Sequence, residues 1–317
     1  MKISLITPAA KHSRAGNRTT AVRWARILRR LGHRVDVATG YMDENADLMV
    51  ALHAWRSADA VARFRELHPA RPLVVALTGT DIYRFLESHP GPTLASMAAA
   101  DALVCLHDLV GEAIPKRFGA KLYVIHQSAL PLPERRQPRR RTFDICVAGH
   151  LREEKDSLRA AYAVRDLPAG SRIRVIHLGQ AHDKDWAEAA QAEMARNQRY
   201  VWKGEVAGWA VRREFVKTRL MVLSSIMEGG ANVISEAAVA GVPVIASRIH
   251  GSLGLLGRDY AGYYPAKDTV ALRAMLLRAE QEPAFLKNLE KGVGAKAKLF
   301  TPAREQAGWK RVLKNLR

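Results

Sequence analysis

Two glutamates in the second half of the chain, Glu228 and Glu236, bracket a glycine-containing segment. The residues between them that we expect to approach a ligand are Gly229, Gly230, Ala231, Asn232 and Val233. The pattern predicts a loop, a short helix from about Asn232 to Gly241, and a buried strand opened by Pro243. Backbone N–H groups at the start of such a helix attract anions, above all phosphate. An ionised carboxylate accepts two hydrogen bonds, so Glu236 suits a ribose diol and Glu228 the ligand beyond the phosphates.

A plainer interpretation is that the two glycines form a turn and that Glu236 is a solvated helix residue. For a single glutamate this interpretation would be preferred. It is weaker here because loop glycines, spaced carboxylates, a helix stop and a following strand occur together.

The loop after the first strand candidate carries several cations. The residues of this loop that we expect at an anion are Lys11, Arg14, Gly16, Asn17 and Arg18. The loop lies at a strand-to-helix junction, where backbone N–H groups bind anions well. For Gly16, Asn17 and Arg18 we expect contact with an acceptor or a phosphate, whereas for Lys11 taken singly we favour a role in solubility.

A third group of polar residues follows the strand candidate 73–77. Thr78, Gly79 and Thr80 stand at its carboxyl end and are expected to contact the acceptor. His53 and His107 also end strand candidates, and either side chain could reach the ligand. Each is more often a hydrogen-bonded structural histidine, and of the two we favour His107 for catalysis.

The segment from Glu228 to Glu236 resembles the E-x7-E signature of the GT-B glycosyltransferases, which use nucleotide-sugar donors. The resemblance implies two Rossmann-like domains that face a cleft, with the donor bound by the second domain. It also implies that Glu228 takes part in catalysis and that the segment as a whole binds the donor.

The stretch from Gly149 to Lys155 resembles the G-R-L-x-x-x-K motif of that family, which grips the donor diphosphate. His150 stands at the usual arginine position, and Arg152 follows two residues later. The resemblance implies that Gly149 binds the donor and that Arg152 and Lys155 act in catalysis. Fixed cations stabilise the charge that develops on a leaving nucleoside diphosphate.

These cations remove the need for a metal, so we expect no metal ion and no other cofactor. The only D-x-D candidate is formed by Asp183 and Asp185, with a lysine between them. We interpret it as charge at the N-terminus of a helix.

The stretches 16–25 and 149–156, together with Thr78 where relatives often carry a histidine, resemble one subgroup of the family. This subgroup is the selenosugar synthases of selenoneine biosynthesis. The resemblance implies UDP-N-acetylglucosamine (UDP-GlcNAc) as donor, selenophosphate as acceptor, and a new carbon–selenium bond at the anomeric carbon. A selenium nucleophile needs no general base, in keeping with the missing histidine.

The surrounding pattern predicts an α/β chain with parallel, doubly wound sheets. The strands expected in the first half are 3–6, 34–38, 48–52, 73–77, 102–106 and 122–125, with a helix from about 19 to 31. Those expected in the second half are 144–148, 173–178, 220–223 and 242–246. We predict an N-terminal domain over 1–128, a basic linker over 129–142 and a C-terminal domain over 143–301. The segment 302–317 is amphipathic, and the resemblance to GT-B proteins implies that it forms a terminal helix that crosses back to the first domain.

Composition agrees with two globular domains. The chain has 317 residues, 48% of them hydrophobic, and only two cysteines, which suits packed cores in a reducing, cytoplasmic compartment. No charge-free apolar run reaches the ~18 residues of a membrane helix, so we expect no stable membrane insertion. The net charge is +19, with its densest arginine cluster in the linker, where we expect a solvated face. Because aromatics are not interleaved with these cations, we expect no nucleic-acid partner.

Two alternatives remain open from the sequence. One is a glycosyltransferase that acts on a lipid-linked or lipopolysaccharide hydroxyl at a membrane surface, to which the basic residues would bind. The other is a non-enzymatic protein that binds anions or nucleic acid on a GT-B scaffold. Two carboxylates at the anion site speak against the second alternative.

Overall fold

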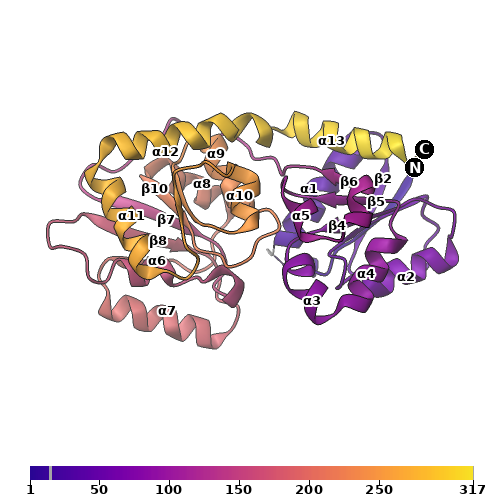
Figure 1. Cartoon of the computed structure of the whole chain (residues 1–317), viewed down its shortest axis with the longest axis horizontal. Helices are drawn as coiled ribbons and strands as arrows, with labels where there is room; N and C mark the ends of the chain where they lie inside the picture. Colours follow the sequence, from indigo (N-terminus) through magenta and orange to yellow (C-terminus); the bar gives the residue numbers. More distant parts are fainter. Residues whose placement is uncertain (14–15, 317) are drawn as a thin grey trace. The chain divides into compact units, whose positions relative to one another are not determined.

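The structure is a computed structural model that describes residues 1–13 and 16–316 of the chain. Contacts divide the chain into two compact units (Figure 1). The first unit comprises Met1–Gln127, Glu228–Gly230 and Thr301–Arg317, and the second comprises Ser128–Met227 and Ala231–Phe300.

The first unit is built on a six-stranded sheet with the order β2-β1-β3-β4-β5-β6, in which every pair is parallel. Its strands are β1 (Lys2–Ile6), β2 (Arg34–Ala38), β3 (Leu48–Leu52), β4 (Leu73–Leu77), β5 (Ala102–Cys105) and β6 (Leu122–Val124). Its helices are α1 (Gly16–Arg30), α2 (Ala58–Leu67), the π-helix η1 (Asp81–Phe85), α3 (Leu86–Ser88), α4 (Pro90–Ala99), α5 (Val110–Ala113), the 3-10 helix η2 (Lys116–Lys121) and α13 (Pro302–Asn315).

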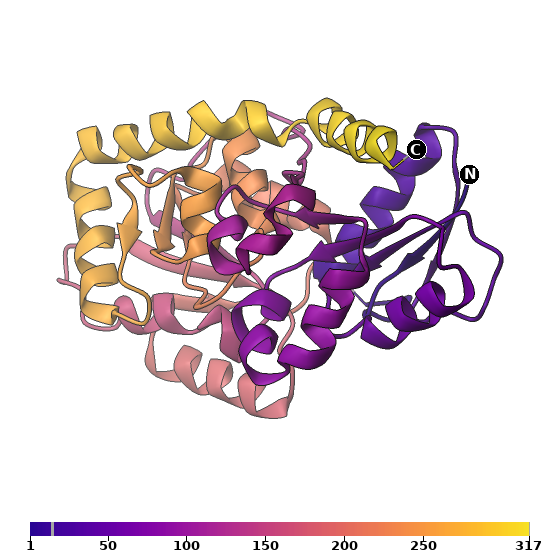
Figure 2. The ribbon, with the colours of Figure 1, turned by 45° about the vertical axis from the view of Figure 1, so that its right-hand side comes forward.

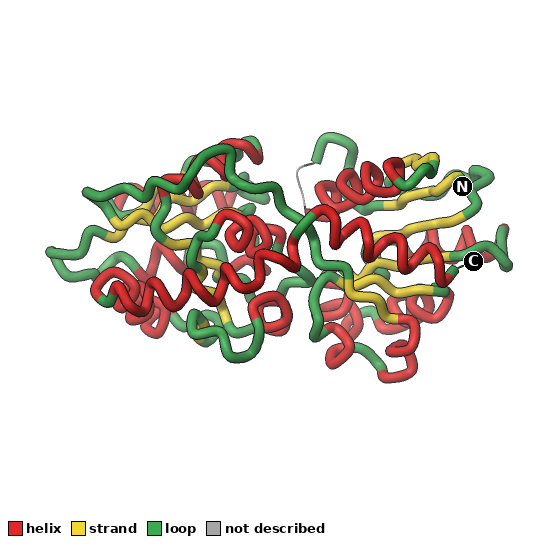
Figure 3. The backbone as a smooth tube through the Cα atoms, turned by 90° about the horizontal axis from the view of Figure 1, so that it is seen from above, coloured by secondary structure: helices red, strands yellow, loops and turns green. Residues whose placement is uncertain are grey.

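Both faces of this sheet are covered by helices (Figure 3). Successive side chains of a strand point to opposite faces. On β3, Leu48 and Val50 pack in a cluster with residues of α1 and α13, whereas Met49 and Ala51 pack in a second cluster with residues of α2 and α4. Burial on both faces explains why the strands read as continuous apolar runs in the sequence.

Helix α13 packs against α1, as Figures 1 and 2 show. The indole rings of Trp24 and Trp309 meet edge to face, with 4.9 Å between their centroids. Buried Glu305 lies beside them, and its Oε1 accepts hydrogen bonds from Trp24 Nε1 at 2.8 Å and from Arg23 Nε at 3.0 Å. The Thr301 side chain caps the start of the helix by accepting a hydrogen bond from the Arg304 N–H.

The second unit has its own six-stranded parallel sheet, with the order β12-β11-β10-β7-β8-β9. Its strands are β7 (Phe143–Ala148), β8 (Ile173–Leu178), β9 (Tyr200–Trp202), β10 (Leu220–Leu223), β11 (Val244–Ser247) and β12 (Tyr263–Tyr264). Its helices are η3 (Glu153–Lys155), α6 (Arg159–Ala163), α7 (Lys184–Arg196), α8 (Gly208–Lys217), α9 (Asn232–Ala240), α10 (His250–Leu256), α11 (Thr269–Gln281), α12 (Pro283–Lys296) and η4 (Ala297–Phe300). The predicted fold class, two parallel Rossmann-like sheets, is confirmed.

The prediction of a solvated basic stretch over 129–142 is wrong for part of its length. Arg136 keeps only 15% of its side-chain surface exposed and donates hydrogen bonds to the carbonyl oxygens of Gly241 and Thr218. The backbone N–H groups of Gln137 and Arg139 bind the carbonyls at the end of α8. Carbonyls at a helix C-terminus lack partners within the helix, so the stretch is bound to the second unit.

Both cysteines, Cys105 and Cys146, are free and buried in strands of the two sheets. Among the described residues, no helix combines the length and the apolar character needed to cross a membrane.

Replacing Trp309 with alanine is expected to lower the free energy of unfolding by about 3–5 kcal/mol, because it opens a cavity beside Trp24. Urea denaturation followed by circular dichroism measures the change. Trp309→Phe should cost much less, since Trp309 Nε1 is buried and has no hydrogen-bond partner among the described residues. Trp209, which is 57% exposed, provides the matched control: Trp209→Ala should change stability by less than about 0.5 kcal/mol. Equal losses in the two alanine variants would contradict this account of α13.

Candidate functional site

The carboxyl edge of the second sheet is the first place to look for a site, because loops that follow parallel strands gather there. β7 and β8 pair up to their last residues, Ala148 with Leu178. The pairing continues into the loops: Gly149 N donates to Leu178 O at 2.9 Å, and Leu151 N donates to Gln180 O at 2.9 Å. The predicted donor-binding residue Gly149 is therefore held in place by its neighbouring strand.

The two loops approach so closely that one side chain is excluded. A Cβ atom on Gly179 would lie 1.9 Å from the carbonyl oxygen of Gly149, a distance at which the backbones would have to separate. Glycine is the only residue that fits this position without moving the Gly149 loop.

A buried histidine binds the carbonyl oxygen of Gly149. His177, in β8, donates from Nε2 to Gly149 O at 3.1 Å, so its Nδ1 accepts the hydroxyl hydrogen of Tyr200 at 2.9 Å. Burial lowers the pKa of His177 from 6.5 to about 4, so the ring is neutral at physiological pH. Sequence reasoning missed this histidine because it lies within an apolar strand.

Lys155 reaches the carboxyl edge at the end of η3. The Ser224 hydroxyl, just after β10, lies 3.0 Å from the carbonyl oxygens of both Lys155 and Asp156. Ile226 N donates to Glu154 O at 2.9 Å, so the loop after β10 fixes the turn that carries the lysine. Asp156 closes this turn in the left-handed conformation, with φ of 44°.

A small pocket opens between these loops. It has a volume of about 10 Å³ and is lined by the ends of β7 and β10 together with polar residues: His150, Lys155, Ser157, His177, Ser224 and Ser225. Arg152 does not line this pocket. Its Nε lies 3.8 Å from Glu154 Oε2, and its backbone N–H is bound by Ser157 Oγ at 3.0 Å. Of the two cations predicted for the leaving group, the structure brings only Lys155 to the pocket.

Helix α9 carries the second half of the predicted donor segment. Ala231 is its N-cap and makes no side-chain hydrogen bond to the helix, whereas α7, α11 and α13 are capped by Asp183, Asp268 and Thr301. The helix ends at Gly241, which has φ of 67°. Asn232 and Val233 begin the helix, and Glu236 is half-buried one turn further on. The first turn of α9 contains no acidic residue, and the N-terminal end of a helix carries a partial positive charge.

The remaining residues predicted for the donor, Glu228, Gly229 and Gly230, group with the first unit. Gly229 is buried, and the other two are half-buried. Their roles stay predictions.

The predicted acceptor loop after β1 is described in part. Lys11 is exposed, Gly16 is the first residue of α1, and Asn17 and Arg18 are half-buried in its first turn. The first turn of α1 contains Arg18 and no acidic residue. The charge of Arg18 therefore adds to the partial positive charge of the helix N-terminus. Arg14 lies outside the described residues.

The loop with Thr78, Gly79 and Thr80 is organised by a carboxylate to which the sequence assigned no role. Asp81 is fully buried, and its oxygens accept backbone hydrogen bonds from Thr78, Gly79 and Ile82 at 2.7–3.2 Å. It also accepts the N–H of Ala54, at 3.0 Å, from the loop after β3. Multiple N–H donors compensate the burial of this carboxylate and tie two loops together.

His53 strengthens the same connection. Its Nδ1 accepts the Arg56 N–H at 3.1 Å, so Nε2 donates to the hydroxyl of Thr80 at 2.9 Å. Its backbone is left-handed, with φ of 77°, a conformation that costs a non-glycine residue on the order of 1 kcal/mol. Burial lowers the pKa of the ring. His53 therefore holds Thr80 in a fixed position.

His107, favoured for catalysis from the sequence, is fully buried. Its Nδ1 accepts the Leu109 N–H at 3.2 Å, and its Nε2 donates to the hydroxyl of Tyr83 at 3.0 Å. With both ring nitrogens bound, the geometry matches the alternative left open by the sequence, a hydrogen-bonded structural histidine. A catalytic role for His107 gains no support from these contacts.

The D-x-D candidate has the role predicted for it. Asp183 is the N-cap of α7, and its side chain accepts the Trp186 N–H at 3.0 Å. Over the part of the chain that the structure describes, no group of three or more His, Cys, Asp or Glu side chains is arranged to hold a metal ion.

Comparisons with known proteins identify the family. Residues 133–292, half of the chain, match the profile described as "Glycosyl transferases group 1". No curated protein sequence matches significantly.

Solved structures share the fold at low sequence identity. HepE from Anabaena, in complex with UDP and glucose, has a TM-score of 0.79 and 15% identity over 99% of this chain and 100% of that chain. Sucrose-phosphate synthase from Thermosynechococcus elongatus has a TM-score of 0.76 and 14% identity over 99% and 98%. The pneumococcal O-GlcNAc transferase GtfA, in complex with UDP and GlcNAc, has a TM-score of 0.67 and 16% identity over 85% and 56%.

The buried histidine makes stability depend on pH. Between pH 6.5 and 4 the unfolded chain binds a proton at His177 that the native protein does not bind, so stability falls as pH falls through this window. The expected loss is about 3 kcal/mol. Urea denaturation at several pH values, compared with His177→Gln, isolates this contribution from that of the carboxylates. The variant should be less stable at pH 7 and lose less stability on acidification; parallel pH profiles would contradict a neutral, buried His177.

Proposed function

Because the chain belongs to the group 1 glycosyl transferases, we propose that it transfers a sugar from a UDP-sugar to a small anionic acceptor. The observation that carries the proposal is the position of Lys155 at the carboxyl edge of the second sheet. A turn that Ser224 fixes from the neighbouring strand β10 holds this lysine beside the small pocket. This is the edge at which open α/β sheets bind ligands.

The second unit binds the donor. The start of α9 has no side-chain cap and no acidic residue, so its N–H groups suit the diphosphate. Glu236 follows one turn later and accepts hydrogen bonds from the ribose hydroxyls. The UDP complexes of HepE and GtfA, proteins of similar fold, support a uridine nucleotide as the donor.

Lys155 stabilises the leaving group. Negative charge accumulates on the diphosphate as the bond from the anomeric carbon to its oxygen breaks, and a fixed ammonium group interacts with this charge more strongly in the transition state. Arg152 supplies a second cation from the same turn and helps to bind the diphosphate from outside the pocket. These cations do the work that a metal ion does in other transferases, and we propose that none is required.

The sugar is N-acetylglucosamine and the acceptor is selenophosphate. Three features support this choice. The stretches 16–25 and 149–156 resemble the selenosugar synthases, position 78 is a threonine, and the first turn of α1 carries Asn17 and Arg18 and no acidic residue. The acceptor is small and anionic, and its selenium attacks without a general base. A selenium lone pair forms the bond to the anomeric carbon while the carbon–oxygen bond breaks, and UDP departs with that electron pair.

The experiment that tests this proposal measures UDP release by the purified protein with UDP-GlcNAc, with and without selenophosphate. Mass spectrometry identifies the sugar product. We expect UDP release that depends on selenophosphate, together with a selenium-containing sugar. If UDP-GlcNAc binds and turns over only with another acceptor, the selenophosphate assignment is wrong and the donor assignment stands. If UDP does not bind, the donor site itself is wrong.

Replacing Glu236 with alanine is expected to weaken UDP binding by about tenfold or more, since a charge-assisted hydrogen bond contributes about 1.5–3 kcal/mol. Isothermal titration calorimetry measures the affinity. Glu188 in α7 is an exposed glutamate on the same unit, and Glu188→Ala is the matched control. UDP affinity that is unchanged in Glu236→Ala, or reduced equally in the control, would contradict the role of Glu236.

A further inference from the structure

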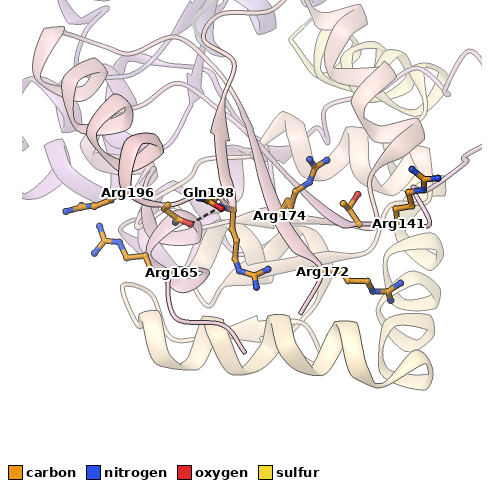
Figure 4. A pocket seen from close by; sticks show the side chains of 9 residues that line it. Arg141, Arg165, Arg172, Arg174, Arg196 and Gln198 are labelled. Carbon is orange, nitrogen blue, oxygen red and sulfur yellow. Dashed lines mark hydrogen bonds between the residues drawn. The ribbon is translucent and has the colours of Figure 1, made fainter. Parts of the chain in front are cut away.

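A second cavity lies at the opposite, amino edge of the second sheet. It is open to solvent, has a volume of about 430 Å³, and is lined by six arginines: Arg141, Arg165, Arg172, Arg174, Arg196 and Arg199. They come from the segments that lead into β7, β8 and β9, from β8 itself, and from the ends of α6 and α7. In Figure 4, Arg141 and Arg172 lie on one side and Arg165 and Arg196 on the other, with Gln198 and Arg174 between them.

Two buried carboxylates behind the cavity orient part of this cluster. Glu193 accepts the Nε hydrogens of Arg165 and Arg196, both at 2.9 Å. Asp144 accepts two hydrogen bonds from Arg174, both at 3.1 Å. Both carboxylates are fully buried and neither lines the cavity, so the wall itself contains cations and neutral polar groups.

The arginine side chains remain partly exposed to solvent although the buried carboxylates bind them. The side chains of Arg165, Arg174 and Arg196 are 34%, 33% and 59% exposed. A guanidinium has five N–H donors, so a group that uses one edge on a buried carboxylate retains donors on another. Arg199 donates to the carbonyls of Ser171 and Ile173 at 2.7 and 3.2 Å, which fixes its position at the cavity.

We propose that this cavity binds a small anion that carries two or more phosphate groups. Arginine pairs with phosphate through two parallel hydrogen bonds, and six arginines exceed the charge of the two carboxylates behind them. The volume falls in the range of about 300–1,000 Å³ that small-molecule sites occupy. The arginines stand on two sides of the cavity, an arrangement that matches phosphates at the two ends of one ligand.

The composition of the wall favours a small anion over a nucleic acid. No aromatic side chain is among the residues that line the cavity, whereas proteins that bind single strands stack bases on aromatic rings. The cavity is also separate from the proposed donor pocket. β7 runs from Phe143 beside the cavity to Ala148 at the pocket, a length of roughly 16 Å.

The test titrates the full-length protein with inorganic tripolyphosphate in a calorimeter at an ionic strength of about 0.15 M, where distant surface charges are screened. The informative variant is Arg141→Gln with Arg172→Gln. Neither side chain binds Glu193 or Asp144, so both buried carboxylates keep their partners. We expect saturable binding by the wild type and an affinity lower by about tenfold or more in the double variant. Arg196→Gln, which leaves Arg165 on Glu193, gives a second, independent loss.

Two controls separate this site from other sources of binding. Lys287→Gln with Lys291→Gln removes the same amount of charge from exposed positions on α12 and should leave the affinity within about twofold. Lys155→Ala removes a cation from the donor pocket and should leave the tripolyphosphate affinity of the arginine cavity unchanged.

Three results would overturn the proposal. The first is an equal loss of affinity in the α12 control, which would indicate general electrostatic attraction. The second is orthophosphate binding as tight as tripolyphosphate, which would exclude a ligand with several phosphates. The third is displacement of tripolyphosphate by a single-stranded oligonucleotide at lower concentration, which would assign the cavity to nucleic acid.

Discussion

The parallel pairing of β7 with β8 and β10 is the constraint on which the chemistry of the second unit depends. Parallel strands end at a common edge, so the loops that follow them must share a small space. The pairing of Ala148 with Leu178 brings Gly149 beside Gly179, and the end of β10 brings Ser224 to the turn that carries Lys155. The polar groups of the pocket therefore owe their positions to backbone pairing between apolar strands, which the core stabilises.

The first unit solves the same problem with buried polar side chains. The buried carboxylate of Asp81 accepts hydrogen bonds from N–H groups in the loops after β3 and β4, and these bonds compensate its loss of hydration. His53 adds a hydrogen bond to Thr80. A buried charge is costly unless it is fully hydrogen-bonded, so the two loops must keep their positions for the unit to remain folded. Stability and the geometry of the proposed acceptor loop are thus maintained by the same contacts.

Much of the fold follows from the sequence because strands buried on both faces appear as apolar runs between turn residues. β12 was missed because two residues, Tyr263 and Tyr264, are too few to show a period. Helix α1 begins at Gly16, three residues before the predicted start, since its first turn is polar and carries no capping pattern. The error over Arg136 has another cause. An arginine in a charged, proline-containing stretch looks solvated, and only the tertiary structure supplies the helix-end carbonyls that bury it.

The same reasoning applies to the candidate sites. Motif spacing predicts donor-binding roles for Lys155 and Glu236. The structure places Lys155 at the pocket beside Ser224, and the role of Glu236 stays a prediction. The arginines of the second cavity are spread from position 141 to position 199 and come together only through the sheet, so no local pattern could predict them. The role of His177 has no local signal for a related reason: its partners, Tyr200 and Gly149, are distant in the sequence. Asp81 binds its neighbours Thr78 and Gly79, but its connection to Ala54 is likewise set by the tertiary structure.

The contact between Gly179 and Gly149 also has a consequence for substitutions. With no room for a methyl group between the loops after β7 and β8, neither loop can change its path alone. The effects of substitutions add at positions that do not touch, whereas a side chain at position 179 and the path of the loop after β7 are coupled. We therefore expect a substitution of Gly179 to require a shift of Gly149, whereas residues on the exposed face of α7 can vary without disturbing either loop.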